Sequence, residues 1–305
     1  MIRRSEDGNV RPASVAPEDS QQYGRATAAA TKARPERGAS RGGGGGRGSA
    51  AVPSPPALSH YFGGGGTKTA GTADEERSTE MAFFAAFHAV YVVVAASVLG
   101  HQYLSAVPPY PSGYSWLVLV LLFNAFFGAL SRGRGGSVLH EMWVFCAILS
   151  LFMVFPDMVL CYFGLLTFPE DGVYRIGHVV SCYMAFMWTI PLLWCVVAAY
   201  HCSSTHSGKI VAASFTALFV FTACESVFPQ LFNIWGPTEK VQLQYHHISL
   251  FVLPAEALLG GATQFALNRT KGASIPEKVL ASVFVSLFYT GCLGVSYLLI
   301  EIPNR

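Results

Sequence analysis

Apolar residues gather into long runs after residue 80, and short polar or turn-rich stretches separate these runs. A helix rises about 1.5 Å per residue, so about 20 apolar residues are needed to cross a hydrocarbon core of roughly 30 Å. By this measure we predict an all-α, polytopic membrane domain over residues 81–301. Its seven transmembrane helices are expected at about 81–104, 114–130, 142–166, 178–200, 209–231, 245–267 and 279–301. The second run is the shortest, so a bundle of six helices is the main alternative.

Residues 1–80 contain no such run. The stretch RGGGGGRGSAAVPSPP begins at Arg41, and a run of glycines follows at 63–66. Segments this rich in Gly, Arg, Ala and Ser bury too little apolar surface to offset the entropy that is lost on folding. We therefore expect residues 1–80 to form a disordered, low-complexity cytoplasmic tail.

The composition identifies lipid as the solvent around the rest of the chain. Hydrophobic residues make up 52% of the sequence and charged residues 12%, well below the roughly 25% charged content of soluble domains. The formal net charge of +2 averages over a charged tail and a nearly uncharged body. This distribution indicates no nucleic-acid partner, and membrane lipid is the partner that we expect.

The loops between the predicted helices differ in basic residues, which are enriched on the cytoplasmic side of membrane proteins. Loops on the side of the tail hold Arg132, Arg134, Lys209, Arg269, Lys271 and Lys278. The opposite side holds Arg175, Lys240 and the C-terminal Arg305. We therefore predict a cytoplasmic N-terminus and a C-terminus on the far side of the membrane. The loop charges do not indicate which organelle contains this membrane. This orientation excludes G-protein-coupled receptors, and the lack of a lysine within the last helix excludes microbial rhodopsins.

Three carboxylic acids, Asp157, Glu225 and Glu256, fall inside predicted helices, where an ionisable group is costly unless it is paired or hydrated. All three are expected at the midplane or in the far-side half of the membrane. Each also lies within four residues of a proline, at Pro156, Pro229 or Pro254. A proline inside a helix leaves the carbonyl four residues earlier without its donor. We predict that the three acids share a polar cavity open to the far side, where they are candidate catalytic residues. The alternative is that they are protonated, structural groups that bond these carbonyls.

Further polar residues are expected near the far-side helix ends, and they are additional candidates for lining the cavity. They are His101, His178, His246, His247 and Gln230. The alternative for the histidines is an interfacial position without a ligand. Glu301 and Lys278, at helix ends, are expected to be solvated.

We interpret the seven cysteines as small packing residues, and the alternative is a disulfide between Cys161 and Cys182. No spacing indicates zinc or any other metal, and no cofactor is expected.

Three stretches carry a resemblance: FPDMVLCYFGLLTFPEDG at 155–172, YMAFMWTIPLLW at 183–194 and HISLFVLPAEALLG at 247–260. Together they resemble an uncharacterised family of multi-helix membrane proteins, a domain of unknown function, over about residues 82–300. That resemblance implies a helical membrane domain and no particular activity.

Two known enzyme classes resemble the chain more weakly. Membrane-embedded lycopene-type carotenoid cyclases carry Pro-x-Glu-Glu motifs, and Pro254-Ala255-Glu256 matches in part, with Ala257 where the second acid would stand. This likeness implies acid catalysis on a polyene. Ser97 and His101 fit one element of the ceramidase-like zinc hydrolases, but no His-x3-His follows.

Two classes of function remain open at this point. The first is a cofactor-free enzyme that acts on a lipid or isoprenoid, with Glu256 or Glu225 as the general acid. The second is a proton- or cation-coupled carrier that uses the same acids. An enzyme should have an apolar pocket beside the acids, whereas a carrier should have a hydrated path and an internal repeat, which the sequence does not reveal. A non-catalytic scaffold is the third alternative.

Overall fold

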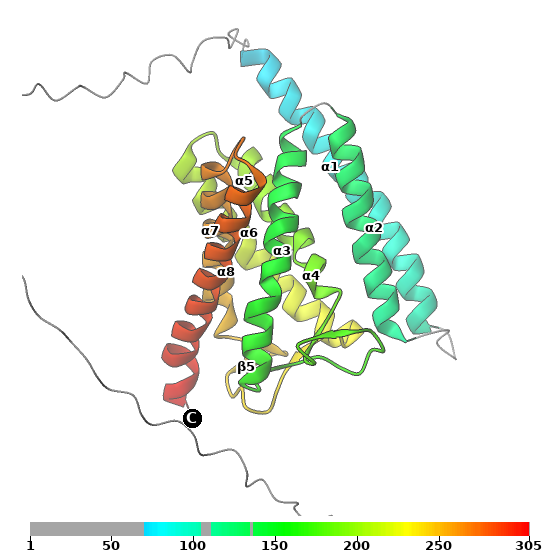
Figure 1. Cartoon of the computed structure of the whole chain (residues 1–305), viewed down its shortest axis with the longest axis vertical. Coiled ribbons are helices and arrows are strands. Elements are labelled where there is room, and N and C mark those ends of the chain that lie inside the picture. The colour runs from blue at the N-terminus through cyan, green and yellow to red at the C-terminus, as the bar shows by residue number, and fades with distance from the viewer. Residues whose placement is uncertain (1–69, 105–110, 135–136, 305) are drawn as a thin grey trace, which may run out of the picture. The chain divides into compact units, whose positions relative to one another are not determined.

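The computed structural model describes residues 70–304, apart from 105–110 and 135–136. These residues belong to the larger of two units of the chain, and most of them are helical (Figure 1). The helices are α1 (Ala70–Leu104), α2 (Ser112–Gly133), α3 (Val138–Tyr162), α4 (Met184–Met187), α5 (Thr189–Cys202), α6 (His206–Val227), α7 (Val252–Arg269) and α8 (Ile275–Ser296). The π-helix η1 (Phe228–Phe232) extends α6, while η2 (Tyr297–Glu301) and the 3-10 helix η3 (Ile302–Asn304) extend α8.

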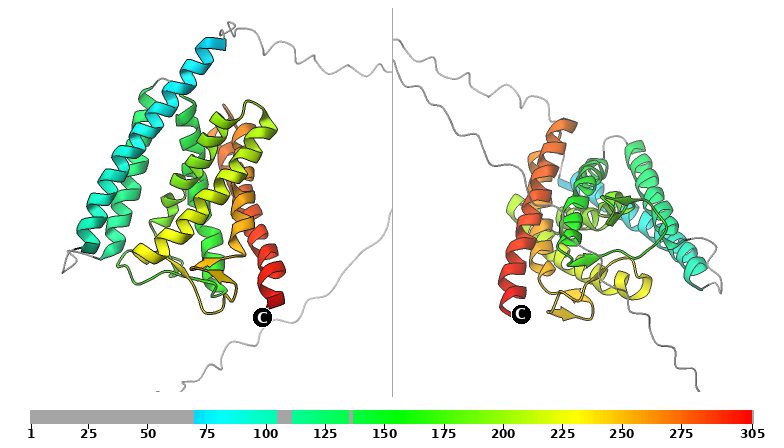
Figure 2. Two further views of the ribbon diagram at one scale, coloured as in Figure 1. Left: turned by 180° about the vertical axis from the view of Figure 1, so that it is seen from behind. Right: turned by 60° about the horizontal axis from the view of Figure 1, so that its bottom comes forward.

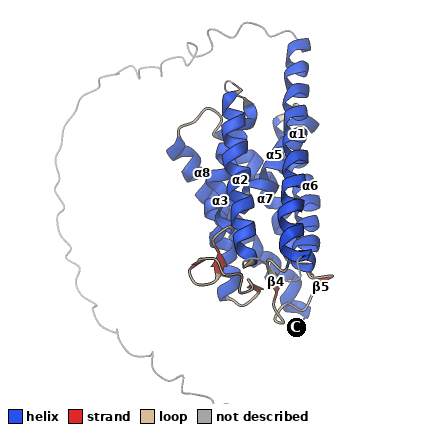
Figure 3. Cartoon of the chain, turned by 90° about the vertical axis from the view of Figure 1, so that its right-hand side faces the viewer, coloured by secondary structure: helices blue, strands red, loops and turns tan. Residues whose placement is uncertain are grey.

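Three pairs of two-residue strands lie at one end of the helices (Figure 3). Strand β1 (Leu166–Thr167) pairs antiparallel with β4 (Gly236–Pro237), with Leu166 opposite Pro237. Strands β2 (Arg175–Ile176) and β3 (Val180–Ser181) form one hairpin, and β5 (Gln244–Tyr245) and β6 (Ile248–Ser249) form another.

Six helical segments in the described residues are long and apolar enough to cross a membrane by length and composition. They correspond to α1, α2, α3, α4 with α5, α6 with η1, and α8 with its extensions. Large apolar side chains on their outer faces are exposed, for example Val93 at 66% and Phe219 at 72%, as expected where the surrounding solvent is lipid. The remaining helix, α7, is 18 residues long and packs among α3, α5, α6 and α8. The predicted all-α membrane protein with seven helices is therefore confirmed.

Several predicted helix boundaries are wrong. The first helix begins at Ala70 rather than 81, so residues 70–80 are not tail, and Glu80 accepts a hydrogen bond from the Val138 amide at 3.2 Å. Residues 1–69 of the predicted tail lie outside the described residues. The fourth and sixth helices begin at Met184 and Val252 rather than 178 and 245, because the residues before them form hairpins.

Local sequence explains the observed ends and breaks. Helix α3 begins after Ser137, whose side chain accepts a hydrogen bond from the His140 amide, and α8 begins with a capping box of Ser274 and Glu277. The segment from Met184 to Cys202 breaks at Trp188, between α4 and α5. Pro191 follows three residues later, and proline cannot donate the backbone hydrogen bond that would continue the first helix.

Helices α6 and α7 lie side by side and approach closely (Figure 2). A Cβ atom at Gly260 would lie 2.4 Å from the Ala217 Cβ, and one at Gly261 would lie 2.4 Å from the Ser214 Oγ. The two glycines therefore bring α7, which carries Glu256, against α6, which carries Glu225.

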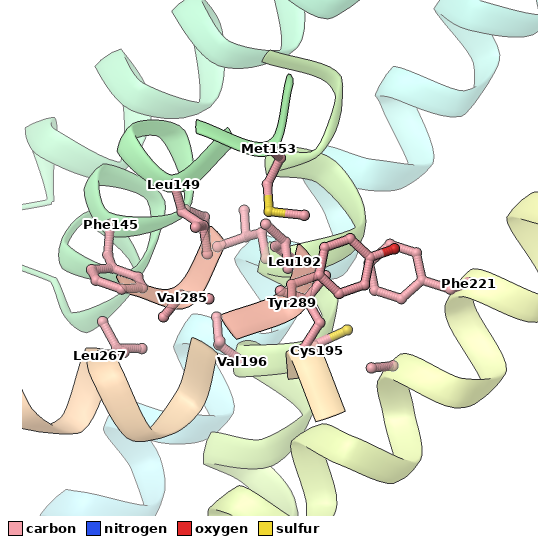
Figure 4. Close-up of a cluster of buried hydrophobic side chains, with 14 of the residues drawn as sticks. Phe145, Leu149, Met153, Leu192, Cys195, Val196, Phe221, Leu267, Val285 and Tyr289 are labelled. Carbon is pink, nitrogen blue, oxygen red and sulfur yellow. The ribbon is translucent and has the colours of Figure 1, made fainter. Parts of the chain in front are cut away.

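Figure 4 shows the apolar core that holds α3, α5, α6, α7 and α8 together. Phe145, Leu149 and Met153 of α3 are fully buried there. Leu192 of α5, Phe221 of α6 and Tyr289 of α8 are buried in the same cluster. This packing fixes the relative positions of the three helices that carry the predicted acids.

Candidate functional site

A cavity of about 570 Å³ lies between the helices, and Asp157, Glu225 and Glu256 all line it. The acids come from α3, α6 and α7. Leu166 of β1 and Pro237 of β4 also line the cavity, so it extends toward the end of the helices that the strands occupy. Its volume falls within the range of about 300–1,000 Å³ that is typical of ligand pockets.

Asp157 is 4% exposed and follows Pro156 inside α3. The indole Nε1 of Trp188 donates a hydrogen bond to its Oδ2 at 3.0 Å. Pro156 was expected to leave the Phe152 carbonyl free near the cavity, but Ser286 Oγ of α8 donates to that carbonyl at 2.8 Å. Trp188 is therefore the donor to Asp157, and Ser286 is the donor to the Phe152 carbonyl.

Glu225 is half-buried near the end of α6. Trp235 Nε1 donates to its Oε1 at 3.1 Å, so a second indole holds a second acid. Trp235 itself is 8% exposed and follows the π-helix η1, which contains Pro229. Single π turns are frequent at functional sites, and Phe228 and Phe232 of this one line the cavity.

Glu256 differs from the other two acids. It lies near the start of α7 and is 2% exposed, and its Oε2 has no hydrogen-bond partner among the described residues. Pro254 is the third residue of α7, where a backbone N–H has no partner within the helix in any case. The expected freeing of the Leu250 carbonyl by this proline is therefore wrong.

The three carboxyl groups form one cluster. Glu256 lies close enough to Glu225 and Asp157 to interact with both electrostatically. Tyr289 of α8, which is 3% exposed and lines the cavity, interacts in the same way with all three acids. The structure thus brings together the three acids that the sequence singled out.

The remaining lining is almost entirely apolar, and much of it is aromatic. Trp116, Phe228 and Phe232 pack edge to face or tilted, with ring centroids 5.3–6.2 Å apart. No Lys, Arg or His occurs among the described residues that line the cavity.

The cavity reaches the lateral surface of the helices. Val92 of α1 lines it and is 61% exposed, and Ala223 of α6 is also both lining and exposed. The cavity is therefore open to the lateral surface of the helices near α1 and α6.

The other predicted cavity residues do not line the cavity. His101 lies in the last turn of α1 and is exposed. His178, His246 and His247 lie in hairpin turns with φ of 63°, 47° and 71°, rather than at helix ends. Gln230 donates to the backbone carbonyl of His246 at 3.0 Å. The three turn histidines and Gln230 therefore belong to the hairpins and their contacts, and His101 belongs to an exposed helix end. None of these five predicted residues lines the cavity.

Two further expectations are wrong. Glu301 and Lys278 are 0% and 5% exposed rather than solvated. Glu301 accepts hydrogen bonds from the amides of Gln242 and Leu243, and Lys278 pairs with Glu141 at 3.4 Å. All seven cysteines are free, so the alternative disulfide does not form.

Sequence reasoning missed Trp188, Trp235 and Tyr289. Trp188 lies 31 residues from Asp157 and on another helix, so no local spacing links the two. Tryptophan is also common in membrane proteins as a belt or packing residue. Only the fold reveals that two indoles donate hydrogen bonds to Asp157 and Glu225.

Residues 154–300 match a family model described as "Domain of unknown function (DUF6989)". The match confirms the predicted resemblance to an uncharacterised family over these residues, which include all three acids, both indoles and Tyr289. No curated protein and no solved structure matches the chain. The weaker likenesses to cyclases and zinc hydrolases therefore gain no support from these comparisons.

Proposed function

We propose that the membrane domain is an enzyme that protonates a lipid-soluble substrate, with Glu256 as the general acid. One observation carries the proposal: within the part of the chain that the structure describes, the Glu256 Oε2 is buried without a hydrogen-bond partner beside an apolar cavity. A carboxyl group removed from water and from donors is favoured in its neutral, protonated form. It therefore holds a proton next to the space that a substrate would fill.

Asp157 and Glu225 have a different role in this proposal. Each accepts a hydrogen bond from an indole, which can only donate. A donor of this kind offsets part of the cost of placing a negative charge on a buried carboxyl group, and Glu256 Oε2 has no such donor among the described residues. One of the two acids can therefore receive the proton that the substrate loses later in the reaction. Proton transfer in this order changes no oxidation state and requires no cofactor.

The lining favours an enzyme over a carrier. A carrier that moves protons or cations needs a hydrated path between the two faces of the membrane. The cavity is instead surrounded by apolar and aromatic side chains and reaches the lateral surface near Val92 and Ala223. This arrangement suits a substrate that enters from the lipid.

Deuterium transfer tests the proposal even when the substrate is unidentified. Membranes containing the full chain are incubated in D2O with lipids from the source cells, and stable carbon-bound deuterium in extracted lipids is measured by mass spectrometry. We expect a lipid to gain deuterium with the natural protein. Glu256→Gln should lower the rate by about 10²- to 10⁴-fold, the usual contribution of a general acid, because an amide has no proton to transfer.

The matched control is Glu239→Gln, at an exposed acid in the loop after β4, which should leave the rate unchanged. Both variants should keep the thermal stability of the natural protein, because glutamine has nearly the shape of glutamate. Equal deuterium transfer with and without the Glu256 carboxyl would overturn the proposal. Loss of proton flux across liposomes in Glu256→Gln, without any deuterium transfer in the natural protein, would identify a carrier.

We also propose that the N-terminus is cytoplasmic and that the strand pairs lie on the far side. The basic residues of the connections support this orientation, with Arg132, Lys209 and Lys271 at the opposite end from the hairpins. Asn268-Arg269-Thr270 is a glycosylation sequon on the proposed cytoplasmic side. Expression in a secretory-pathway membrane should leave Asn268 unmodified, and its glycosylation would reverse the orientation.

A further inference from the structure

The cavity is built to favour a positive charge. Three carboxyl groups and the hydroxyl of Tyr289 lie in or beside it, while no basic side chain lines it among the described residues. Aromatic rings attract cations to their faces, and the attraction is strongest where water is excluded. A ligand that carries phosphate or another anion would meet repulsion here, so prenyl diphosphates and phospholipid headgroups do not fit.

The aromatic side chains form two groups, and each is joined to one acid. Trp235 bonds Glu225 and packs against Phe228 at 5.4 Å, and Phe228 in turn packs against Trp116 at 5.7 Å. Trp188 bonds Asp157 and packs against Phe221 at 5.3 Å and Tyr289 at 6.0 Å. Aromatic rings and the carboxyl groups of Asp157 and Glu225 therefore surround the part of the cavity beside Glu256.

We infer that the substrate is a neutral isoprenoid alkene that reacts through a tertiary carbocation. This inference rests on the proposed function, because it takes Glu256 as the proton donor. The branched double bonds of isoprenoids give tertiary cations on protonation, whereas straight-chain alkenes give less stable secondary ones. A tertiary carbocation of an isoprenoid is a positive charge on an otherwise apolar molecule. The aromatic rings and carboxyl groups of the cavity would stabilise such a charge.

The steps balance without a co-reactant. The O–H bond of Glu256 breaks, and the π electrons of the double bond form a new C–H bond at its less substituted carbon. The neighbouring carbon becomes the cation. The carboxylate of Asp157 or Glu225 then removes a proton from an adjacent carbon, and that C–H electron pair forms a new double bond. The proton returns through the carboxyl cluster to Glu256, and the product is an isomer of the substrate.

A stable amine can replace the short-lived cation in a binding experiment. The full chain in lipid nanodiscs is titrated with N,N-dimethylfarnesylamine, which is an ammonium ion on an isoprenoid chain at pH 7. Farnesol has a neutral head on the same chain, and N,N-dimethyldodecylamine has the same head on an unbranched chain. Empty nanodiscs correct for partition into lipid. We expect the isoprenoid amine to bind about tenfold more tightly than farnesol, as a desolvated cation–π contact implies. It should also bind more tightly than the dodecyl amine, because the inference assigns the cavity a branched isoprenoid chain.

A ring-specific variant tests which side chains recognise the charge. Phe228→Leu keeps the cavity wall apolar but removes an aromatic face, so it should weaken binding of the isoprenoid amine severalfold and leave farnesol binding unchanged. The matched control is Phe219→Leu, which changes a phenylalanine of α6 that is 72% exposed and should have no effect.

Each outcome decides one part of the inference. Equal binding of farnesol and the isoprenoid amine would overturn recognition of the cation. Equal binding of the two amines would overturn the isoprenoid body, and equal effects of Phe228→Leu and Phe219→Leu would overturn the aromatic contact. None of these results would contradict deuterium transfer that depends on Glu256. The substrate class can therefore be wrong while the proposed function is right.

Discussion

The connection between α3 and α4 and the connection between α6 and α7 follow the same plan. Each begins with a short strand, β1 or β4, and these two strands pair with each other. Each continues with a hairpin that ends in a buried serine, Ser181 or Ser249, and then enters a helix. Seven residues after the serine, the first connection leads to Trp188 and the second to Glu256.

The position seven residues after the serine is thus occupied by side chains of different chemistry in the two connections. Trp188 supplies a hydrogen-bond donor to Asp157, whereas Glu256 supplies a carboxyl whose Oε2 has no partner among the described residues. The hairpins therefore position a group at the cavity, while the side chain at that position decides its role. The sequence did not reveal the shared plan of these two connections because the hairpins differ in turn length and share few residues beyond the serine.

The two hairpins also differ in how they are anchored. Asp171 accepts a hydrogen bond from Ser181 Oγ at 2.6 Å, across 10 residues of sequence. The second hairpin is preceded by Gln242 and Leu243, whose amides donate to Glu301, 59 and 58 residues away. The side-chain anchor of the first connection is therefore local, although the Asp171 carbonyl also accepts a hydrogen bond from the Gly113 amide of α2 at 3.0 Å. The side-chain anchor of the second connection lies at a distant helix end.

After Glu256→Gln, the largest effect should follow from changing the donor in the first connection. Trp188→Phe keeps the ring but removes the N–H. Asp157 then loses its indole donor, and in the proposed mechanism a hydrogen bond to its carboxylate is worth about 1.5–3 kcal/mol. We expect the rate of deuterium transfer to fall by about 10- to 100-fold, which is less than for Glu256→Gln. Trp235→Phe is the matched variant for Glu225. A Trp188→Phe protein with the natural rate would show that the indole only packs.

A smaller effect, on stability rather than rate, should separate the two anchors. Glu301→Ala leaves two amides without their acceptor, and each unsatisfied group costs about 1–3 kcal/mol. Asp171→Ala removes the acceptor of one hydroxyl and of the Val173 amide, 3.3 Å away within the same loop. We expect both variants to lower the unfolding free energy in detergent, with the larger loss for Glu301→Ala. The reverse order would contradict the view that the second hairpin depends on the distant helix.

The smallest effect should come from the turn histidines. His178 and His247 have positive φ, which costs most residues about 1–2 kcal/mol and glycine almost nothing. His178→Gly and His247→Gly should therefore keep or slightly raise thermal stability, whereas His178→Ala, which keeps a Cβ and the cost of positive φ, should leave it nearly unchanged. None of the three should alter deuterium transfer. A loss of activity in the glycine variants would restore these histidines as candidate site residues.

Sequence alone could predict the helices and the acids because both depend on strong local energetics. Apolar runs of membrane length are unambiguous, and a carboxyl inside such a run is costly enough to require a reason. The hairpins were missed because strands of two residues leave almost no periodic pattern, and Val179 and Ile248 extend the neighbouring apolar runs. The partners of Asp157 and Glu225 depend on contacts between helices, which no spacing within one helix encodes.

The distant anchor at Glu301 also sets an order of assembly. A chain is synthesised from its N-terminus, so the first hairpin can close on Asp171 as soon as Ser181 has been made. The amides of Gln242 and Leu243, just before the second hairpin, lack the Glu301 acceptor until α8 has been inserted and η2 has formed, because Glu301 lies at the end of η2. Until that moment the helix that follows the second hairpin, with Glu256 near its start, lacks its final support. The second connection, which leads to Glu256, is thus completed later in biosynthesis than the first.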